Sequence, residues 1–457
     1  MGHATDDADS AYRRVACRHP WSSVVAFYNT DIGEVRYLLM DGHNFGLAAA
    51  VLSWNRHSIC AAELARRVFG VVNCPYFDDH DTCEPAYAGR SGKHALRLIY
   101  DWMGVPLSVG EKDVDFAHSN PFLGVVSDLA GFAVRREVCM RSKPERVARI
   151  VCDAESFLAR GEFPHGEASS FIGKVEYTTM SASSHRVGRA ALSALRAYHT
   201  ARSDGLREAL WPGVVAALEF FISVLVLLPP RRFALCKRRR LPIVLYTDAM
   251  YRRRRDGVEV SVIGLVWYDP ELVGPVHSGW KHASSEVPPE LLAAWGDKET
   301  KITQAEAVAP VVAVLSDPDA FRDREVVHYI DNSGALFGLG KGASRDVPTA
   351  RLVHVFHALA AALGMLVWFS YVPSKANVAD LPSRLEFALL KEMGSQEVKE
   401  LRWPPATESW LDAVRSAFKD FAPAKRRQEK KWRSEIVEAI EVERRRRAAM
   451  KRKRDAW

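Results

Sequence analysis

The chain has 457 residues, of which 48% are hydrophobic and 26% are charged. These proportions are ordinary for a globular protein and exclude a collagen-like, mucin-like or wholly disordered chain. The length predicts about two to four domains. Seven cysteines lie far apart, which argues against a secreted disulfide framework and for the nucleus or cytoplasm. The longest apolar run, residues 214–228, is shorter than the roughly 20 residues of a bilayer span. We therefore expect a buried helix there and no membrane partner.

The net charge of +7 is concentrated at one end, because residues 425–457 hold 14 Lys/Arg and 6 Asp/Glu. Such a segment suits a nucleic-acid backbone. Its short Lys/Arg clusters also fit a nuclear-import signal, and its interleaved glutamates fit a plain solvated helix. The sequence leaves these three interpretations open.

Periodicity predicts the elements of the first half of the chain. In order we expect a hairpin over 23–40, a helix over 46–70, a strand at 71–74, and helices over 91–103, 145–160 and 185–202. From residue 240 the pattern changes to strands at 243–247, 258–267, 326–330 and 366–372, with a helix over 348–363. Strands that alternate with helices indicate an α/β sheet over about 240–390, followed by charged helices.

Four acidic residues of this second half lie at the ends of expected elements, where they can converge on one edge of a sheet. They are Asp248, Glu306, Asp331 and Asp380. A carboxylate cluster repels itself unless cations neutralise it, and Mg²⁺ or Mn²⁺ is the natural partner of such oxygens. Two such ions can clamp the attacking and leaving oxygens of a phosphodiester.

Each of these residues also has a purely structural interpretation. Asp248 can end a strand in a turn, and Thr303 to Glu306 fits a capping box. The pair Asp331-Asn332 can form an Asx turn or a helix N-cap, and Asp380 can cap a short helix.

The order of the set resembles the ribonuclease H domain of retroelement reverse transcriptases. The pieces are strand–Thr-Asp-Ala, helical Ala-Glu, strand–Asp-Asn-Ser and Asn377-Val-Ala-Asp-Leu-Pro-Ser-Arg384, the last of which resembles LTR-type and DIRS-type elements. The resemblance implies that the four carboxylates bind two metal ions and that the domain cuts the RNA strand of an RNA/DNA hybrid. We expect residues 269–298 to form an inserted loop, Pro310 to kink the helix that carries Glu306, and Arg252–Arg255 to follow the first strand.

Tyr76-Phe-Asp-Asp79 follows a short apolar strand, where paired aspartates can hold metal ions or simply form a wet turn. Together with Asp7-Ala-Asp-Ser-Ala-Tyr-Arg13 and Asn44-Phe-Gly-Leu47, it resembles a reverse transcriptase palm. The resemblance implies metal ligands at Asp7 and Asp78 with Asp79 in support. It also implies nucleotide or primer contacts at Tyr12, Phe45, Gly46, Lys112, Phe122, Leu123 and Gly124.

The chain begins almost at the first aspartate motif, which leaves no room for the fingers of that family. We therefore expect Asp7 to lie in a frayed terminus and DNA synthesis to be weak or lost. Residues 173–189 resemble the thumb-to-connection part of DIRS-type polymerases. The predicted domains are an incomplete palm (1–130), a helical thumb and connection (131–238), a ribonuclease H-like mixed sheet (239–395) and a basic helical tail (396–457).

The expected fold class is thus a multidomain α/β and α+β chain, a fragment of a retroelement polyprotein. The expected function is ribonuclease H action on RNA/DNA hybrids, with vestigial synthesis on an RNA template and a DNA primer. Two alternatives stay open, a decayed or repurposed nucleic-acid-binding protein and a nuclease of the same fold that cuts DNA.

Overall fold

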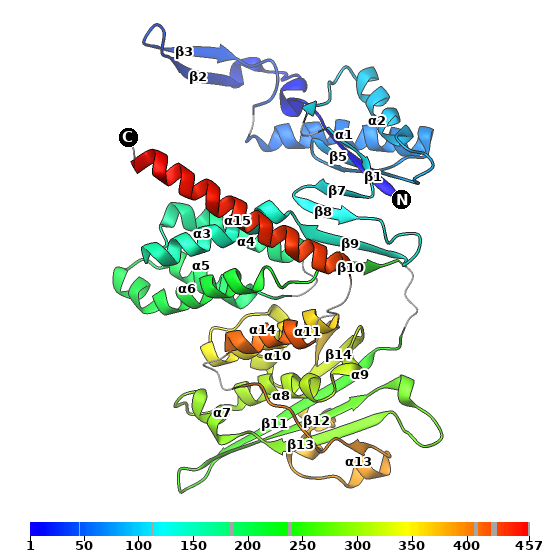
Figure 1. Cartoon of the computed structure of the whole chain (residues 1–457), viewed down its shortest axis with the longest axis vertical. Helices are drawn as coiled ribbons and strands as arrows, with labels where there is room; N and C mark the ends of the chain where they lie inside the picture. The colour runs from blue at the N-terminus through cyan, green and yellow to red at the C-terminus, as the bar shows by residue number, and fades with distance from the viewer. Residues whose placement is uncertain are drawn as a thin grey trace. The chain divides into compact units, whose positions relative to one another are not determined.

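The computed structural model describes residues 1–44, 46–110, 113–182, 186–235, 240–405, 410–421 and 427–455. The backbone divides into two compact units, shown in Figure 1. Unit 1 is Met1–Lys143 with the short segment that begins at Arg232, and unit 2 is Pro144–Arg231 with the rest of the chain. The protein is therefore a mixed α/β multidomain chain. The four-domain division stays a prediction.

Unit 1 is built on a four-stranded antiparallel sheet in the order β4-β5-β1-β6. Helices α1 (Ala48–Phe69) and α2 (Ser91–Trp102) pack on it through a core that includes Trp54, Leu96 and Tyr100. The predicted helices over 46–70 and 91–103 are confirmed. The strands are β1 (Gly2–Asp7), β4 (Val72–Tyr76), β5 (Asp79–Glu84) and β6 (Val114–Ala117).

The expectation that Asp7 lies in a frayed terminus is wrong. Strand β1 pairs with β5 on one side and β6 on the other, and all six of its residues are buried. Its polar composition hid it from periodicity analysis. Its side chains find partners, for example His3 with Asp81 at 2.7 Å, and buried polar groups with partners are compatible with a strand interior.

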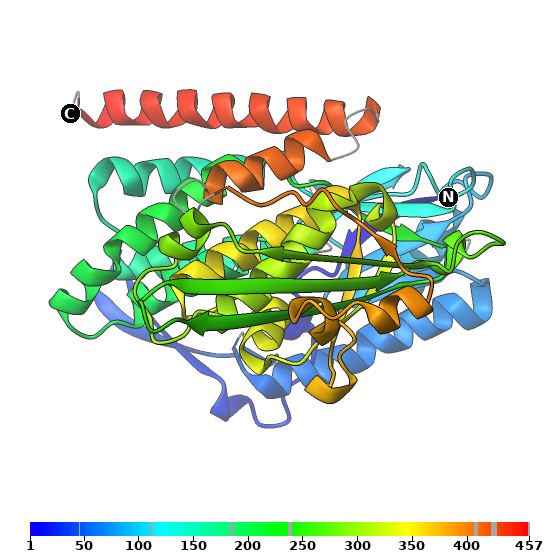
Figure 2. The ribbon, with the colours of Figure 1, turned by 90° about the horizontal axis from the view of Figure 1, so that it is seen from below.

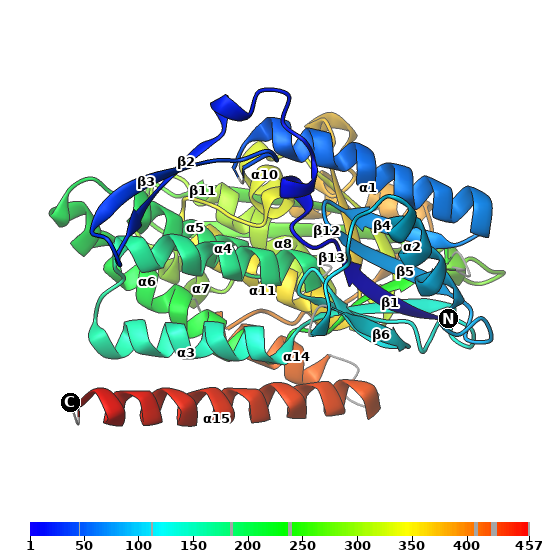
Figure 3. The same ribbon diagram turned by 90° about the horizontal axis from the view of Figure 1, so that it is seen from above.

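A second sheet of unit 1 has the order β10-β9-β8-β7. Its strands are β7 (Ser119–Phe122), β8 (Val125–Asp128), β9 (Glu137–Ser142) and β10 (Arg231–Ala234). The predicted hairpin at 23–40 is confirmed as β2 (Val24–Asn29) and β3 (Glu34–Leu39), which reaches away from the first sheet in Figure 3.

Unit 2 begins with a group of four helices. They are α3 (Pro144–Arg160), α4 (His165–Ala182), α5 (Arg189–Thr200) and α6 (Asp204–Val224). The apolar run at 214–228 supplies most of the buried residues of α6, as expected of a buried helix. No helix among the described residues is long and apolar enough to cross a membrane.

A six-stranded mixed sheet forms the centre of the rest of unit 2, in the order β15-β14-β11-β12-β13-β16. Strands β11, β12 and β13 are antiparallel, whereas β14 and β15 run parallel to β11. The strands are β11 (Ile243–Arg253), β12 (Glu259–Tyr268), β13 (Trp280–Glu286), β14 (Glu325–Ile330), β15 (Leu366–Tyr371) and β16 (Gln396–Glu397).

Helices cover both faces of this sheet, as Figure 2 shows. On one face lie α8 (Ile302–Ser316), α10 (Ser333–Lys341) and α11 (Val347–Leu363), which share the main apolar core with the strands. On the other face lie α12 (Asp380–Ser383) and α13 (Ala388–Glu392), around Val266 and Leu390. The predicted mixed sheet with flanking helices is confirmed.

Two details differ from the predictions, and a third stays untested. Residues 269–298 are not an inserted loop, because they contain β13 and α7 (Pro289–Ala294), whose Leu291 and Leu292 are buried. Helix α8 continues through Pro310 to Ser316, and the kink at Pro310 stays a prediction. Strand β11 runs on to Arg253, and the turn follows it, with a hydrogen bond of 2.8 Å from Arg254 N to Val258 O.

The basic segment forms α15 (Arg427–Asp455), which lies alongside α3 in Figures 2 and 3. Trp432, Ile436 and Ile440 are buried in the main core of unit 2. Arg447 contacts Asp153 of α3 at 2.8 Å. The plain solvated helix is therefore wrong for this face, since α15 is docked on α3. Helix α14 (Trp410–Asp420) also joins the main core.

Candidate metal centre

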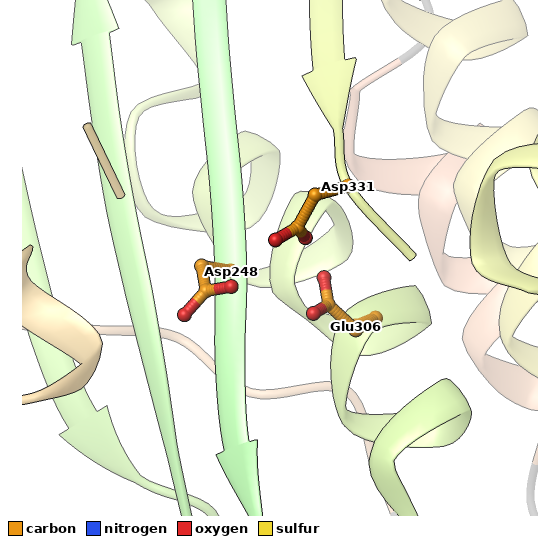
Figure 4. Close-up of side chains that lie close together, drawn as sticks. All are labelled: Asp248, Glu306 and Asp331. Atoms are coloured by element: carbon orange, nitrogen blue, oxygen red, sulfur yellow. The ribbon is translucent and has the colours of Figure 1, made fainter. Parts of the chain in front are cut away.

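Three of the four predicted carboxylates of unit 2 come together. Asp248, Glu306 and Asp331 each offer one oxygen, and these atoms all lie within 4.8 Å of one another. Figure 4 shows Asp248 on β11, Glu306 on α8 and Asp331 directly after β14. Among the described residues this is the one group of three or more potential ligands of this kind.

The parallel pairing of β11 with β14 explains why the two aspartates meet. Tyr246 lies opposite Tyr329 in this register, and Asp248 and Asp331 each come two residues later. Side chains two residues apart point to the same face of a strand. We had expected Asp248 to end its strand, but it lies in the middle of the long β11.

Glu306 reaches the aspartates from α8, with Ala305 and Ala307 beside it fully buried. The main-chain N–H of Ala249 donates to its Oε1 at 3.3 Å. The capping-box interpretation is wrong, because α8 begins at Ile302 and its N-cap Lys301 makes no side-chain capping bond. For the pair Asp331-Asn332 the helix-cap interpretation is confirmed at Asn332, whose side chain accepts a hydrogen bond of 2.9 Å from Ala335 N and caps α10, whereas Asp331 itself is not the cap.

Burial gives the group unusual electrostatics. It raises the pKa of Asp248 to about 6, and the charges of Asp331 and Asp380 add to the rise, whereas a hydrogen bond from Ser383 opposes it. Burial also raises the pKa of Glu306 well above its usual range, with the charges of Asp248 and Asp331 adding to it. Holding three ionised carboxylates together here is therefore unfavourable without a cation.

The donor set fits a hard divalent cation. Glu306 Oε2 and Asp331 Oδ1 are buried side-chain oxygens without a hydrogen-bond partner. Buried polar atoms are seldom left without a partner, and such atoms point to an ion or water in that place. Carboxylate oxygens are the ligands that Mg²⁺ and Mn²⁺ prefer. The triad can therefore hold a divalent cation.

Asp380 lies outside this group of three. It is the first residue of α12, and its Oδ1 accepts a hydrogen bond of 2.7 Å from Arg384 Nε. It is close enough for its charge to raise the pKa of Asp248. It does not cap α12, whose N-cap is Ala379.

Ser383 belongs to the closing motif Asn377–Arg384, and the sequence pattern predicts no role for it. Its side chain is fully buried, and its hydroxyl donates to Asp248 Oδ2. Asn377 of the same motif donates to the main-chain oxygen of Thr247 at 3.0 Å. Both contacts join residues about 130 positions apart, which no local pattern signals.

In unit 1 the predicted carboxylates lie on neighbouring strands. Asp7 of β1 is paired in register with Asp79 of β5, and Asp78 precedes Asp79 in the turn after β4. The main-chain N–H of Ala8 donates to Asp78 O at 2.8 Å, and Ser108 Oγ donates to Asp7 Oδ2 at 2.5 Å. These aspartates are not among the groups of three potential ligands found in the described residues.

The residues predicted to contact nucleotide or primer in unit 1 lie at several different places. Partial burial raises the pKa of Tyr12, and the charge of Asp78 adds to it. Leu123 and Gly124 form the turn between β7 and β8, with φ of 49° and 79°, values typical of a two-residue hairpin turn. Phe122 ends β7, and Gly46 precedes α1. Phe45 and Lys112 lie outside the described residues.

No family model matches the chain, and no curated protein does. Solved structures similar to it are those of a foamy viral protease-reverse transcriptase. A complex with double-stranded DNA has 14% identity and a TM-score of 0.34, covering 81% of this chain and 56% of that one. A complex with an RNA/DNA hybrid has 13% identity and a TM-score of 0.35, covering 82% and 45%. A further complex with double-stranded DNA has 13% identity and a TM-score of 0.35, covering 82% of this chain and 68% of that one. This chain thus spans about half the length of the first two.

Proposed function

We propose that unit 2 carries a metal-dependent nuclease site of the ribonuclease H type, which cleaves the RNA strand of RNA/DNA hybrids. The observation that supports it is the meeting of Asp248, Glu306 and Asp331 within 4.8 Å, from two strands and a helix. Asp380, which lies outside the group of three but whose charge acts on Asp248, is proposed as the fourth ligand. The preference for hybrids rests on the motif resemblance, and the triad by itself serves DNA cleavage equally well.

The residues of the chain have separate tasks in this proposal. Asp248 and Asp331 hold oxygens at fixed places on adjacent parallel strands, and Glu306 brings a third from α8. Two bound Mg²⁺ or Mn²⁺ ions would supply Lewis acidity toward the phosphate and lower the pKa of a water molecule. In the reaction the attacking water would give up one proton to solvent as its oxygen bonds to phosphorus, and the leaving ribose oxygen would take up a proton as its bond to phosphorus breaks.

The test is cleavage of an RNA/DNA hybrid, with the RNA strand and the DNA strand labelled in separate reactions, by the full chain with Mg²⁺ or Mn²⁺. Asp331→Asn is expected to lower the rate by at least about a hundredfold, because the cation that stabilises the charge of the transition state loses a carboxylate ligand. Asp319→Asn is the matched control, because Asp319 is an exposed aspartate of the same unit (side chain 90% exposed).

Cutting of the RNA strand alone, lost with Asp331→Asn and kept with Asp319→Asn, would support the proposal. Equal cutting of double-stranded DNA would favour the DNA nuclease. If the folded chain binds hybrids but cuts nothing with either ion, the decayed or repurposed nucleic-acid-binding protein becomes the better account.

For unit 1 we propose a vestigial RNA-directed DNA polymerase site at Asp7, Asp78 and Asp79. The observation that favours it is the in-register pair Asp7 and Asp79, with Asp78 one residue away at the turn. Primer extension on an RNA template with Mn²⁺ tests it, with Asp78→Asn as the variant. We expect weak or undetectable extension, and any extension should be lost in that variant.

A further inference from the structure

Gly264 creates the space in which the closing motif meets the sheet. It lies opposite Asp248 in the pairing of β11 with β12. A Cβ atom on Gly264 would come within 2.2 Å of Ala379 O and 2.5 Å of Ser383 N. Heavy atoms do not approach so closely, so any other residue here has to push α12 off the sheet.

Polar contacts tie α12 to the strands on either side of that space. Asn377 Nδ2 donates to Thr247 O of β11 at 3.0 Å, and Asn377 Oδ1 accepts from Ala379 N at 3.2 Å. From β13, Ser284 Oγ donates to Pro382 O at 2.7 Å. The helix is therefore anchored to β11 and β13, with β12 between them.

The anchoring places the Ser383 hydroxyl on a carboxylate of the candidate metal centre. Ser383 Oγ donates to Asp248 Oδ2 and also lies 3.0 Å from Asp380 O. A serine hydroxyl has one hydrogen, and the contact with Asp248 is the shorter. Both residues are buried, Ser383 fully and Asp248 with 6% of its surface exposed, so water does not readily replace this hydrogen bond.

We propose that Ser383 is a positioning residue, which holds the Asp248 carboxylate in the orientation that binds the divalent cation, through the close approach that Gly264 permits. This inference rests on the proposed function. Oδ2 is engaged by the hydroxyl, which leaves Oδ1 to face the cation. Partners of this kind commonly change metal affinity about ten- to a hundredfold when they are removed.

The experiment measures Mn²⁺ binding to the full chain without nucleic acid, from the electron paramagnetic resonance signal of free Mn²⁺. Ser383→Ala is expected to weaken binding about tenfold. Ser284→Ala is the matched control, because it removes another serine hydroxyl that holds α12 but touches no carboxylate. It should change the affinity less than about twofold. Ser383→Thr keeps a hydroxyl and is expected to bind more tightly than Ser383→Ala.

The outcomes separate the two proposals. Unchanged Mn²⁺ affinity in Ser383→Ala would overturn the role of Ser383, as would an equal loss in Ser284→Ala, which would mean that anchoring of α12 is all that matters. If the unaltered chain binds no Mn²⁺, the metal centre itself fails and this inference fails with it. Thermal unfolding without metal confirms that each variant is folded.

Discussion

The main-chain N–H of Ala249 donates a hydrogen bond of 3.3 Å to Oε1 of Glu306. It ties the helical carboxylate to the strand that carries Asp248, one residue away. One oxygen of Glu306 is thereby engaged, while the other is buried without a hydrogen-bond partner. The cluster is thus held in place by the fold before any cation arrives.

The first prediction concerns the cost of this arrangement. At a pH high enough to ionise the buried Glu306, Glu306→Gln removes one of three crowded charges and keeps the shape. The metal-free chain should then become more stable by about 1 kcal/mol, or roughly 2 °C in the melting temperature of unit 2. Thermal unfolding in EDTA measures it. Glu290→Gln, on the surface of α7, should leave the melting temperature unchanged. A lower melting temperature in Glu306→Gln would contradict the prediction.

The second prediction concerns pH and metal. The carboxyl of Asp248 has a pKa of about 6 without a cation, and a proton competes with the cation for it. Because its folded pKa is raised, this group makes the metal-free chain less stable as pH rises from about 4 to 6. Stabilisation by Mg²⁺ should therefore be small at pH 5 and larger at pH 7. Melting temperatures with and without Mg²⁺ at both pH values test this. In Asp248→Asn the stabilisation by Mg²⁺ should differ little between pH 5 and pH 7.

The third prediction concerns acid stability of unit 2. Burial lowers the pKa of His354 to about 3, and its ring lies 4.6 Å from that of Phe220 and 4.9 Å from that of Trp410. In the unfolded chain the pKa is about 6.5. The stability that the neutral ring contributes is fully present above that value and is lost as pH falls toward 3.

His354→Phe keeps an aromatic ring and removes the titration. Between pH 7 and pH 5 its unfolding free energy should fall by about 2 kcal/mol less than that of the unaltered chain. Urea unfolding at the two pH values measures the difference. Parallel losses in the two proteins would show that His354 does not contribute.

The fourth prediction tests the docking of α15 on α3. Ile436 is fully buried, whereas its neighbour Val437 is 48% exposed. Ile436→Ala should destabilise unit 2 by about 2–4 kcal/mol, the cost of a cavity in a packed core. Val437→Ala should cost less than about 1 kcal/mol, because it leaves no cavity. Urea unfolding compares them, and equal small effects would mean that the helix is undocked in solution.

Periodicity predicted the elements whose apolar residues repeat regularly, such as α1, α11 and the strands β12 and β14. It missed β1 and β13, whose sequences are largely polar. The side chains of β1 are buried because the distant strands β5 and β6 pair with it, and Asp81 supplies a hydrogen bond to His3. Strand β13 is partly buried and pairs with β12. A local window does not contain that information.

The candidate metal centre was predictable in part. The meeting of Asp248, Glu306 and Asp331 followed from carboxylates at element ends, even though Asp248 lies within its strand. The roles of Gly264 and Ser383 did not follow, because each depends on how closely α12 approaches the sheet. The ligand role of Asp380 and the unit 1 assignments stay predictions.

The origin of β10 has a consequence for the order of events during synthesis. This strand completes the second sheet of unit 1, where Leu235 N donates to Arg136 O at 2.6 Å and Arg232 pairs with Glu137 at 3.1 Å. Its residues follow the whole of α3–α6. As the chain leaves the ribosome, β9 has to wait with an open edge until those helices have been made. An open strand edge invites pairing with other chains. The second sheet of unit 1 is therefore completed only after α3–α6 have been synthesised, although its other three strands precede those helices in the sequence.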